Sequence, residues 1–149
     1  MSTIRHSAVT HIGNVAKVNE DSILSMPDQG VWVVSDGMGG HEAGDFASQT
    51  VVENVAMLPG DLAPRDQLNE LRHALGRAHD VVRVEGTRRG ATIGAAVVLM
   101  ALTDGHFAAL WAGDCRLYRF RDGAIELLTT DHSVVAAYVV SGQMTWDEV

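Results

Sequence analysis

Acidic residues and glycines occur together at three places in the sequence, where their oxygen atoms could bind a metal ion. These segments are GNVAKVNEDS (13–22), SDGMGG (35–40) and WAGDCR (111–116). Each combines a carboxylate, from Glu20 and Asp21, from Asp36 or from Asp114, with a glycine bend beside a predicted strand. Oxygen ligands alone suit a hard cation such as Mg²⁺ or Mn²⁺ rather than zinc or copper. Without a cation, several carboxylates at one sheet edge would repel each other and bind protons.

The glycines that follow Asp36 are explained by the same chemistry. Gly37 would allow a turn directly after Asp36 and would bring its own carbonyl beside the carboxylate. Gly39 and Gly40 would allow further bends. No Gly-Lys-Ser/Thr follows and the G-x-G-x-x-G spacing is missing, so the segment is not a phosphate-binding loop. An isolated Asp-Gly pair is most often a turn that ends a strand, and the pattern alone leaves both interpretations open.

The elements predicted to position these residues are helices and short strands. Strand-like runs occupy residues 22–26, 30–35, 91–102, 106–113, 116–121 and 124–129. The second run is apolar throughout and is predicted to be buried on both faces, and Asp-Gly turns join the last four runs into two hairpins. Apolar residues at helical spacing predict helices over 43–58 and from Pro64 to Val82, and further helices from about Ser133 and from Thr145. This order predicts an α+β fold.

The composition is that of one globular domain, with 149 residues, 46% hydrophobic and 20% charged. The net charge of −8 argues against nucleic-acid binding, which needs clustered Lys and Arg. The single cysteine, Cys115, fits a reducing compartment and is interpreted as a packing residue rather than a catalytic thiol. No signal sequence is visible, and the longest apolar run, 95–102, is too short to span a bilayer. We therefore expect a cytoplasmic protein without membrane association.

Five segments, taken in order, resemble the motifs of the metal-dependent, type 2C (PPM) protein serine/threonine phosphatases, in particular their compact bacterial branch. These segments are VNEDS (18–22), VSDGMGGHEAGDFAS (34–48), RGATIGAAVV (89–98), WAGDCRLYRFRDG (111–123) and LTTDHS (128–133). The resemblance extends from about His6 to Val149. It implies a four-layer α-β-β-α sandwich of two antiparallel sheets flanked by helices, of which residues 1–149 would form the N-terminal portion of a single domain.

The resemblance also implies a binuclear Mn²⁺ or Mg²⁺ centre at one end of the sandwich. In this sequence Asp36 would bridge the two metals and the carbonyl of Gly37 would bind one of them. Glu20 would hold a water of the centre. Asp114 matches the aspartate that helps to hold a third, weaker metal in bacterial members.

Four further residues belong to the same motifs. Asn19 and Asp21 are interpreted as support for their loop rather than as metal ligands. His41 is either a catalytic acid that protonates the leaving oxygen or a residue that caps or lines the following helix. His132 is interpreted as a structural residue that is hydrogen-bonded within its own turn.

The activity that the resemblance implies is hydrolysis of phosphoserine and phosphothreonine by a metal-activated water, without a phosphoenzyme. Bound cations would reverse the local negative potential, so the acidic chain could still accept a phosphate dianion. The implied partners are phosphoproteins, including a Ser/Thr kinase, and the full-length protein would be a monomer.

The sequence departs from the family pattern in two respects. The arginine that grips the substrate phosphate stands three residues before Asn19 in the family, but Ala16 stands there in this sequence. The neighbouring Lys17 would point to the opposite face if this segment were a strand. We therefore expect weaker substrate binding with an intact metal centre.

The second departure is that the chain ends at Val149, before two further metal aspartates of the family. We expect a C-terminally incomplete fragment of a longer phosphatase, unstable and inactive by itself. Two functions remain open: a phosphatase, or a catalytically inactive degenerate domain that binds phosphoproteins or a kinase. A metal-dependent hydrolase of small phosphoesters is a remote third interpretation.

Overall fold

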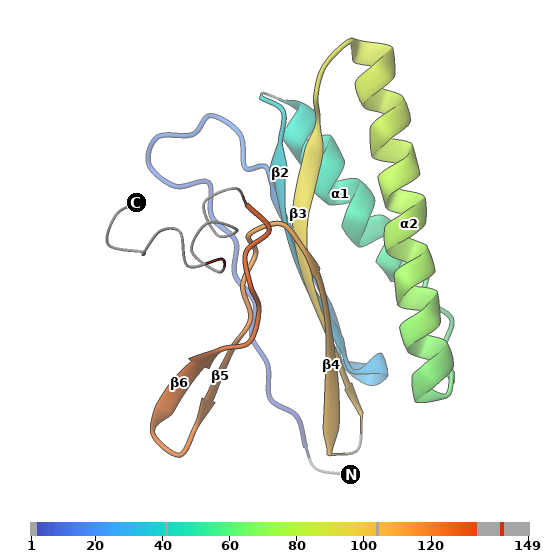
Figure 1. The fold of residues 1–149 in the computed structure, drawn as a ribbon, viewed down its shortest axis with the longest axis vertical. Helices are drawn as coiled ribbons and strands as arrows, with labels where there is room; N and C mark the ends of the chain where they lie inside the picture. Colours follow the sequence, from blue (N-terminus) through green and yellow to red (C-terminus); the bar gives the residue numbers. More distant parts are fainter. Residues whose placement is uncertain (1–2, 41, 104, 134–140, 142–149) are drawn as a thin grey trace.

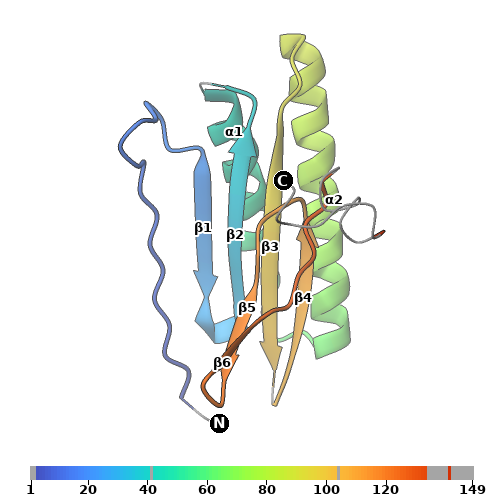
Figure 2. The same cartoon turned by 60° about the vertical axis from the view of Figure 1, so that its left-hand side comes forward.

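The computed structural model describes residues 3–40, 42–103, 105–133 and 141. Its elements are β1 (Asp21–Met26), the 3₁₀ helix η1 (Pro27–Gln29), β2 (Val31–Met38), α1 (Glu42–Ala56), α2 (Pro64–Arg89), β3 (Gly94–Thr103), β4 (His106–Ala112), β5 (Tyr118–Arg121) and β6 (Ala124–Leu127). The first four strands form an antiparallel sheet in the order β1-β2-β3-β4, and β5 pairs with β6 in a separate hairpin. Both helices pack against one side of the sheet and the hairpin lies on the other side (Figures 1 and 2).

The two helices form where the apolar spacing predicts them, and they cover one face of the sheet. α2 begins at Pro64, where the missing N–H would have had no intrahelical partner. It ends at Arg89, and the φ of 62° at the next residue, Gly90, lets the Gly90 N–H reach the carbonyls of the last turn. The core between helices and sheet consists of Val31, Val33, Val51, Val55, Leu58, Leu71, Ala74, Ala78, Val97, Leu99 and Ala101.

Strand β2 is buried on one face only, so the prediction of burial on both faces is wrong for the described residues. Val31 and Val33 are 0% and 2% exposed, whereas Val34 is 46% and Met38 57% exposed. Side chains alternate along a strand, and only the odd-numbered residues of β2 face α1 and α2. Asp36 is an even-numbered residue of β2, as Val34 and Met38 are, and it therefore lies on the open face of the sheet.

The predicted fold class is confirmed by two antiparallel sheets with helices. The turn at Asp122 and Gly123 has positive φ at both residues, 51° and 77°, as hairpin turns of this length require. The helices predicted from about Ser133 and from Thr145 fall almost entirely on residues outside those described. No helix in the described part of the chain is both long and apolar enough to cross a membrane.

Candidate metal centre

The antiparallel sheet brings the predicted acidic residues to one end. Asp21, at the start of β1, is directly opposite Asp36 of β2, and Asp36 is opposite Ala96 of β3. Gly113 follows β4 and packs on Ala96, so closely that a Cβ on Gly113 would lie 2.7 Å from the Ala96 Cβ. Asp114 is the next residue. Three acidic segments far apart in the sequence therefore meet at the same end of the sheet.

The charges at this end act on Asp36. The pKa of Asp36 is raised, first by partial desolvation, then by the charge of Asp21 and a hydrogen bond with its side chain, and further by the charges of Asp114 and Glu20. Each of these effects disfavours the ionised carboxylate in the absence of a cation. A bound divalent cation would reverse the effect, because it favours the charged form.

Glu20 provides the clearest sign of a missing partner. Its Oε1 atom is buried and has no hydrogen-bond partner among the described residues. A buried carboxylate oxygen left without a partner costs about 1–3 kcal/mol or more. The same oxygen lies against the first turn of α1, where a Cβ added to Gly44 would lie 2.2 Å from it. The position therefore suits a cation or a water that the cation orders.

Gly37 has a different role from the predicted turn. It lies inside β2, and its N–H donates to the Glu20 carbonyl at 3.0 Å. A Cβ on Gly37 would lie 1.9 Å from the Gly44 carbonyl oxygen. The turn comes later, at Gly39 and Gly40, whose φ values are 142° and 72°. Gly37 is thus required for close approach of two backbones, and the prediction of a turn directly after Asp36 is wrong.

The donor set fits a hard cation that takes its remaining ligands from elsewhere. Glu20, Asp36 and Asp114 supply only oxygen atoms, which is the preference of Mg²⁺ and Mn²⁺. Within the described ranges, no group of three His, Cys, Asp or Glu side chains could hold a metal ion. Mg²⁺ commonly binds through one or two carboxylates and several waters, so an incomplete protein set is compatible with it.

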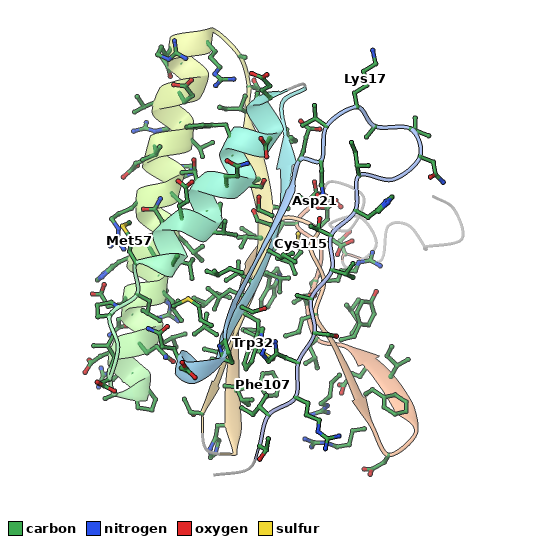
Figure 3. All side chains as sticks on the ribbon, turned by 180° about the vertical axis from the view of Figure 1, so that it is seen from behind. Lys17, Asp21, Trp32, Met57, Phe107 and Cys115 are labelled. Carbon is green, nitrogen blue, oxygen red and sulfur yellow. The ribbon has the colours of Figure 1, made fainter. Side chains whose placement is uncertain are left out.

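Cys115 adjoins the acidic residues, as Figure 3 shows for Cys115 and Asp21. Burial, followed by the charge of Asp36, raises the pKa of the Cys115 thiol to about 11. The thiol is therefore protonated at neutral pH and is a poor nucleophile. This agrees with the interpretation of Cys115 as a packing residue.

The turn that carries Asp114 is held in place by residues 129–133, here named the 129–133 segment. The N–H of Gly113 donates to Nδ1 of His132 at 3.3 Å, and the N–H of His132 donates to the Gly113 carbonyl at 2.9 Å. The His132 ring also stacks on Trp111, whose Nε1 donates to the Thr130 carbonyl. His132 is thus structural, as predicted. Its hydrogen-bond partner, however, is Gly113 in the turn that carries Asp114, and not a residue of the turn that contains His132.

An ion pair also links the chain just after Asp114 to the 129–133 segment. Arg116 donates two hydrogen bonds to the carboxylate of Asp131, at 3.0 Å and 2.7 Å. These bonds lower the pKa of Asp131 and raise that of Arg116. Neither this pair nor the bonds of His132 was predicted, because partners 15 to 19 residues apart leave no periodic signal in one sequence.

The loop before β1 differs from the strand that was assumed for it. Lys17 lies in a bend, and its side chain points away from Asp21 in Figure 3. Alternation along a strand therefore does not apply to Lys17. Its side chain nevertheless points away from Asp21 (Figure 3), so the conclusion that Lys17 does not replace the arginine is unchanged.

Asn19 supports the loop before β1. It accepts a hydrogen bond from the N–H of Asp21 at 3.0 Å and donates one to Thr10 at 2.9 Å, which confirms its supporting role. His41 lies outside the described residues.

Comparison with known sequences agrees with this geometry. The model of the family described as Protein phosphatase 2C matches residues 10–142. The serine/threonine protein phosphatase PstP of Mycobacterium tuberculosis is 31% identical over 147 residues, which are 97% of this chain and 28% of PstP. A putative protein phosphatase 2C-type of Streptococcus pyogenes is 30% identical, over 95% of this chain and 61% of that protein.

Solved structures show the same likeness. PppA, described as a key regulatory component of T6SS in Pseudomonas aeruginosa, superposes with a TM-score of 0.83 at 42% identity, over 87% of this chain and 57% of that one. The catalytic domain of PstP in complex with two manganese ions gives a TM-score of 0.81 at 29% identity, over 91% and 59% of the two chains. The chain spans less than two thirds of the length of these proteins. By its sequence and its fold, the chain belongs to the Protein phosphatase 2C family.

Proposed function

We propose that the protein is a metal-dependent phosphoprotein phosphatase that hydrolyses phosphoserine and phosphothreonine at a binuclear Mn²⁺ or Mg²⁺ centre. The main support is the convergence of Asp36, Asp21, Asp114 and Glu20, in which a buried Glu20 oxygen has no partner among the described residues. The two manganese ions in the structure of the similar PstP domain support the choice of metal. Residues 1–149 would belong to one such phosphatase domain.

The proposed ligand roles are those that the resemblance to the type 2C phosphatases implies for these residues. Asp36 would bind both ions, the carbonyl of Gly37 one of them, and Asp114 a third, weaker one. Glu20 would orient a water, since its backbone is fixed to Gly37 by the 3.0 Å hydrogen bond. When bound, the ions would supply an activated water for in-line attack on phosphorus.

Two further residues would act on the substrate or on the ligands. His41 would protonate the leaving oxygen of the serine or threonine. Asp21 would support the loop before β1, at a position directly opposite Asp36 in the sheet. The proposed substrates are phosphoproteins, including a Ser/Thr kinase.

The direct test of this proposal is phosphate release from a phosphothreonine peptide by the complete protein in the presence of Mn²⁺. We expect release that depends on the metal and that is abolished in Asp36→Asn. Asp80→Asn is the matched control, because Asp80 is an exposed residue of α2 and does not belong to the group formed by Glu20, Asp21, Asp36 and Asp114. Release that continues in Asp36→Asn, or that needs no divalent cation, would contradict the proposal.

The alternative of a non-catalytic binding domain is favoured by one observation. The exposed Ala16 offers no guanidinium to a phosphate at the position of the family arginine. A domain of this kind would bind the phosphopeptide without releasing phosphate. Measurement of peptide binding beside phosphate release therefore separates the two functions.

A further inference from the structure

A groove of about 520 Å³ lies between α2 and β4. Its floor is apolar and includes Leu75 and Val82 of α2, Val97 of β3 and Leu110 of β4. These residues belong to the side of the sheet that the helices cover, whereas Asp36 lies on the open side. The groove is therefore separate from the candidate metal centre.

One wall of the groove is basic. Arg72, His79 and Arg83 line it from α2, at spacings of seven and four residues, which place them on one side of the helix. In the described part of the chain, neither arginine side chain has a hydrogen-bond or ion-pair partner. This wall is unusual in a chain with a net charge of −8. Charge complementarity therefore favours an acidic ligand.

The other wall is an open sheet edge. β4 is the last strand of the described sheet and pairs only with β3 within it. Such an edge presents backbone N–H and C=O groups that an extended peptide can pair with. Every second side chain of such a peptide would face α2, and the others would face the open side of the sheet.

We propose that the groove binds an extended acidic segment of a partner protein, added as a strand to β4. Among the side chains of that segment that face α2, apolar ones would lie on Leu75, Val82 and Leu110, and carboxylates would pair with Arg72 and Arg83. The candidate metal centre would stay accessible, since it lies on the opposite face of the sheet. The inference does not depend on metal binding or on phosphatase activity.

The test uses the full chain and a fluorescent peptide in which every second residue is serine and the residues between them are valine and glutamate in turn, so that one face of the extended peptide carries both. We expect saturable binding by fluorescence anisotropy, weakened at least ~10-fold when Arg72→Glu and Arg83→Glu are combined, which corresponds to ~1.4 kcal/mol. Arg77→Glu is the matched control and should bind as the parent does, since Arg77 is an exposed arginine of the same helix outside the groove. Circular dichroism would verify that each variant folds.

Hydrogen exchange distinguishes pairing with β4 from binding elsewhere. The bound peptide should slow the exchange of amides in His106–Ala112, with no comparable effect in β1. Absence of binding, equal binding of the same peptide with lysine in place of glutamate, or equal loss in Arg77→Glu would overturn the proposal. Self-association of the chain that is lost in the double variant would also overturn it, because a second copy would then occupy the groove.

Discussion

At the scale of single residues, close contact between backbones shapes the candidate centre. Gly37 of β2 and Gly44 of α1 approach so closely that neither has room for a Cβ. The N–H of Gly37 is bonded to the carbonyl of Glu20. This hydrogen bond fixes the backbone of Glu20 next to Gly37, and therefore close to Asp36, the residue before Gly37. The first turn of α1 covers the Glu20 carboxylate.

This packing predicts that Gly37→Ala destabilises the protein. A Cβ at 1.9 Å from the Gly44 oxygen requires the backbones to separate, and such overpacking typically costs about 1–3 kcal/mol. Urea unfolding would measure the loss. Gly76→Ala is the control, because an added Cβ there meets nothing within 4 Å and should stabilise the helix by about 0.5–1 kcal/mol. Equal stability of Gly37→Ala and the parent would show that this account of Gly37 is wrong.

The alanine at the family's arginine position supports a second prediction at this scale. Ala16 is exposed in the loop before β1, so an arginine there has room to reach a substrate phosphate bidentately. Ala16→Arg should lower the KM of the complete protein for a phosphothreonine peptide, with a smaller effect on kcat. Lys17→Arg is the control, since the Lys17 side chain points away from Asp21 (Figure 3). An unchanged KM in Ala16→Arg would contradict the expected weak phosphate binding.

At the scale of elements, the 129–133 segment fixes the turn between β4 and β5. Arg116 and Asp131 form its most directional contact, through two hydrogen bonds. The pKa of Asp131 is lowered in the folded protein, first by its hydrogen bonds with Arg116. The ionised Asp131 therefore stabilises the folded protein in full at pH values above the ordinary aspartate pKa of about 3.9. This contribution is lost as the pH falls through the lowered value.

Asp131→Asn should therefore lower the melting temperature at neutral pH, and the difference from the parent should narrow below about pH 4. Thermal unfolding followed by circular dichroism across this pH range measures both effects. Glu126→Gln provides the comparison, because the Arg119–Glu126 pair on the hairpin is more exposed and should contribute less. A difference for Asp131→Asn that stays constant with pH would exclude the ionic explanation.

The elements themselves could largely be predicted from the sequence. Helical spacing and the Pro64 start locate α1 and α2, and the Asp122-Gly123 turn locates the β5–β6 hairpin, because these signals are local. Burial of β2 could not be predicted, since it depends on which layers cover the sheet. The bend at Lys17 was missed because the segment was assumed to be a strand.

At the scale of the whole molecule, the two faces of the sheet have different chemistry. The helix-covered side contains the core and the groove with its basic wall. Asp36 lies on the open side, and the β5–β6 hairpin lies on that side of the sheet (Figure 2). The sequence predicted that Glu20, Asp36 and Asp114 converge, because each adjoins a strand. It did not predict the contacts of Gly113 and Gly44, which require the packed backbone.

The most direct test of the account is calorimetric titration of the complete protein with Mn²⁺. The account predicts uptake that weakens at least ~10-fold in Asp36→Asn, since even the loss of outer ligand partners typically costs that much, and uptake that is unchanged in Asp80→Asn. No uptake by the parent, or equal uptake by Asp36→Asn, would contradict the claim that these carboxylates bind divalent cations.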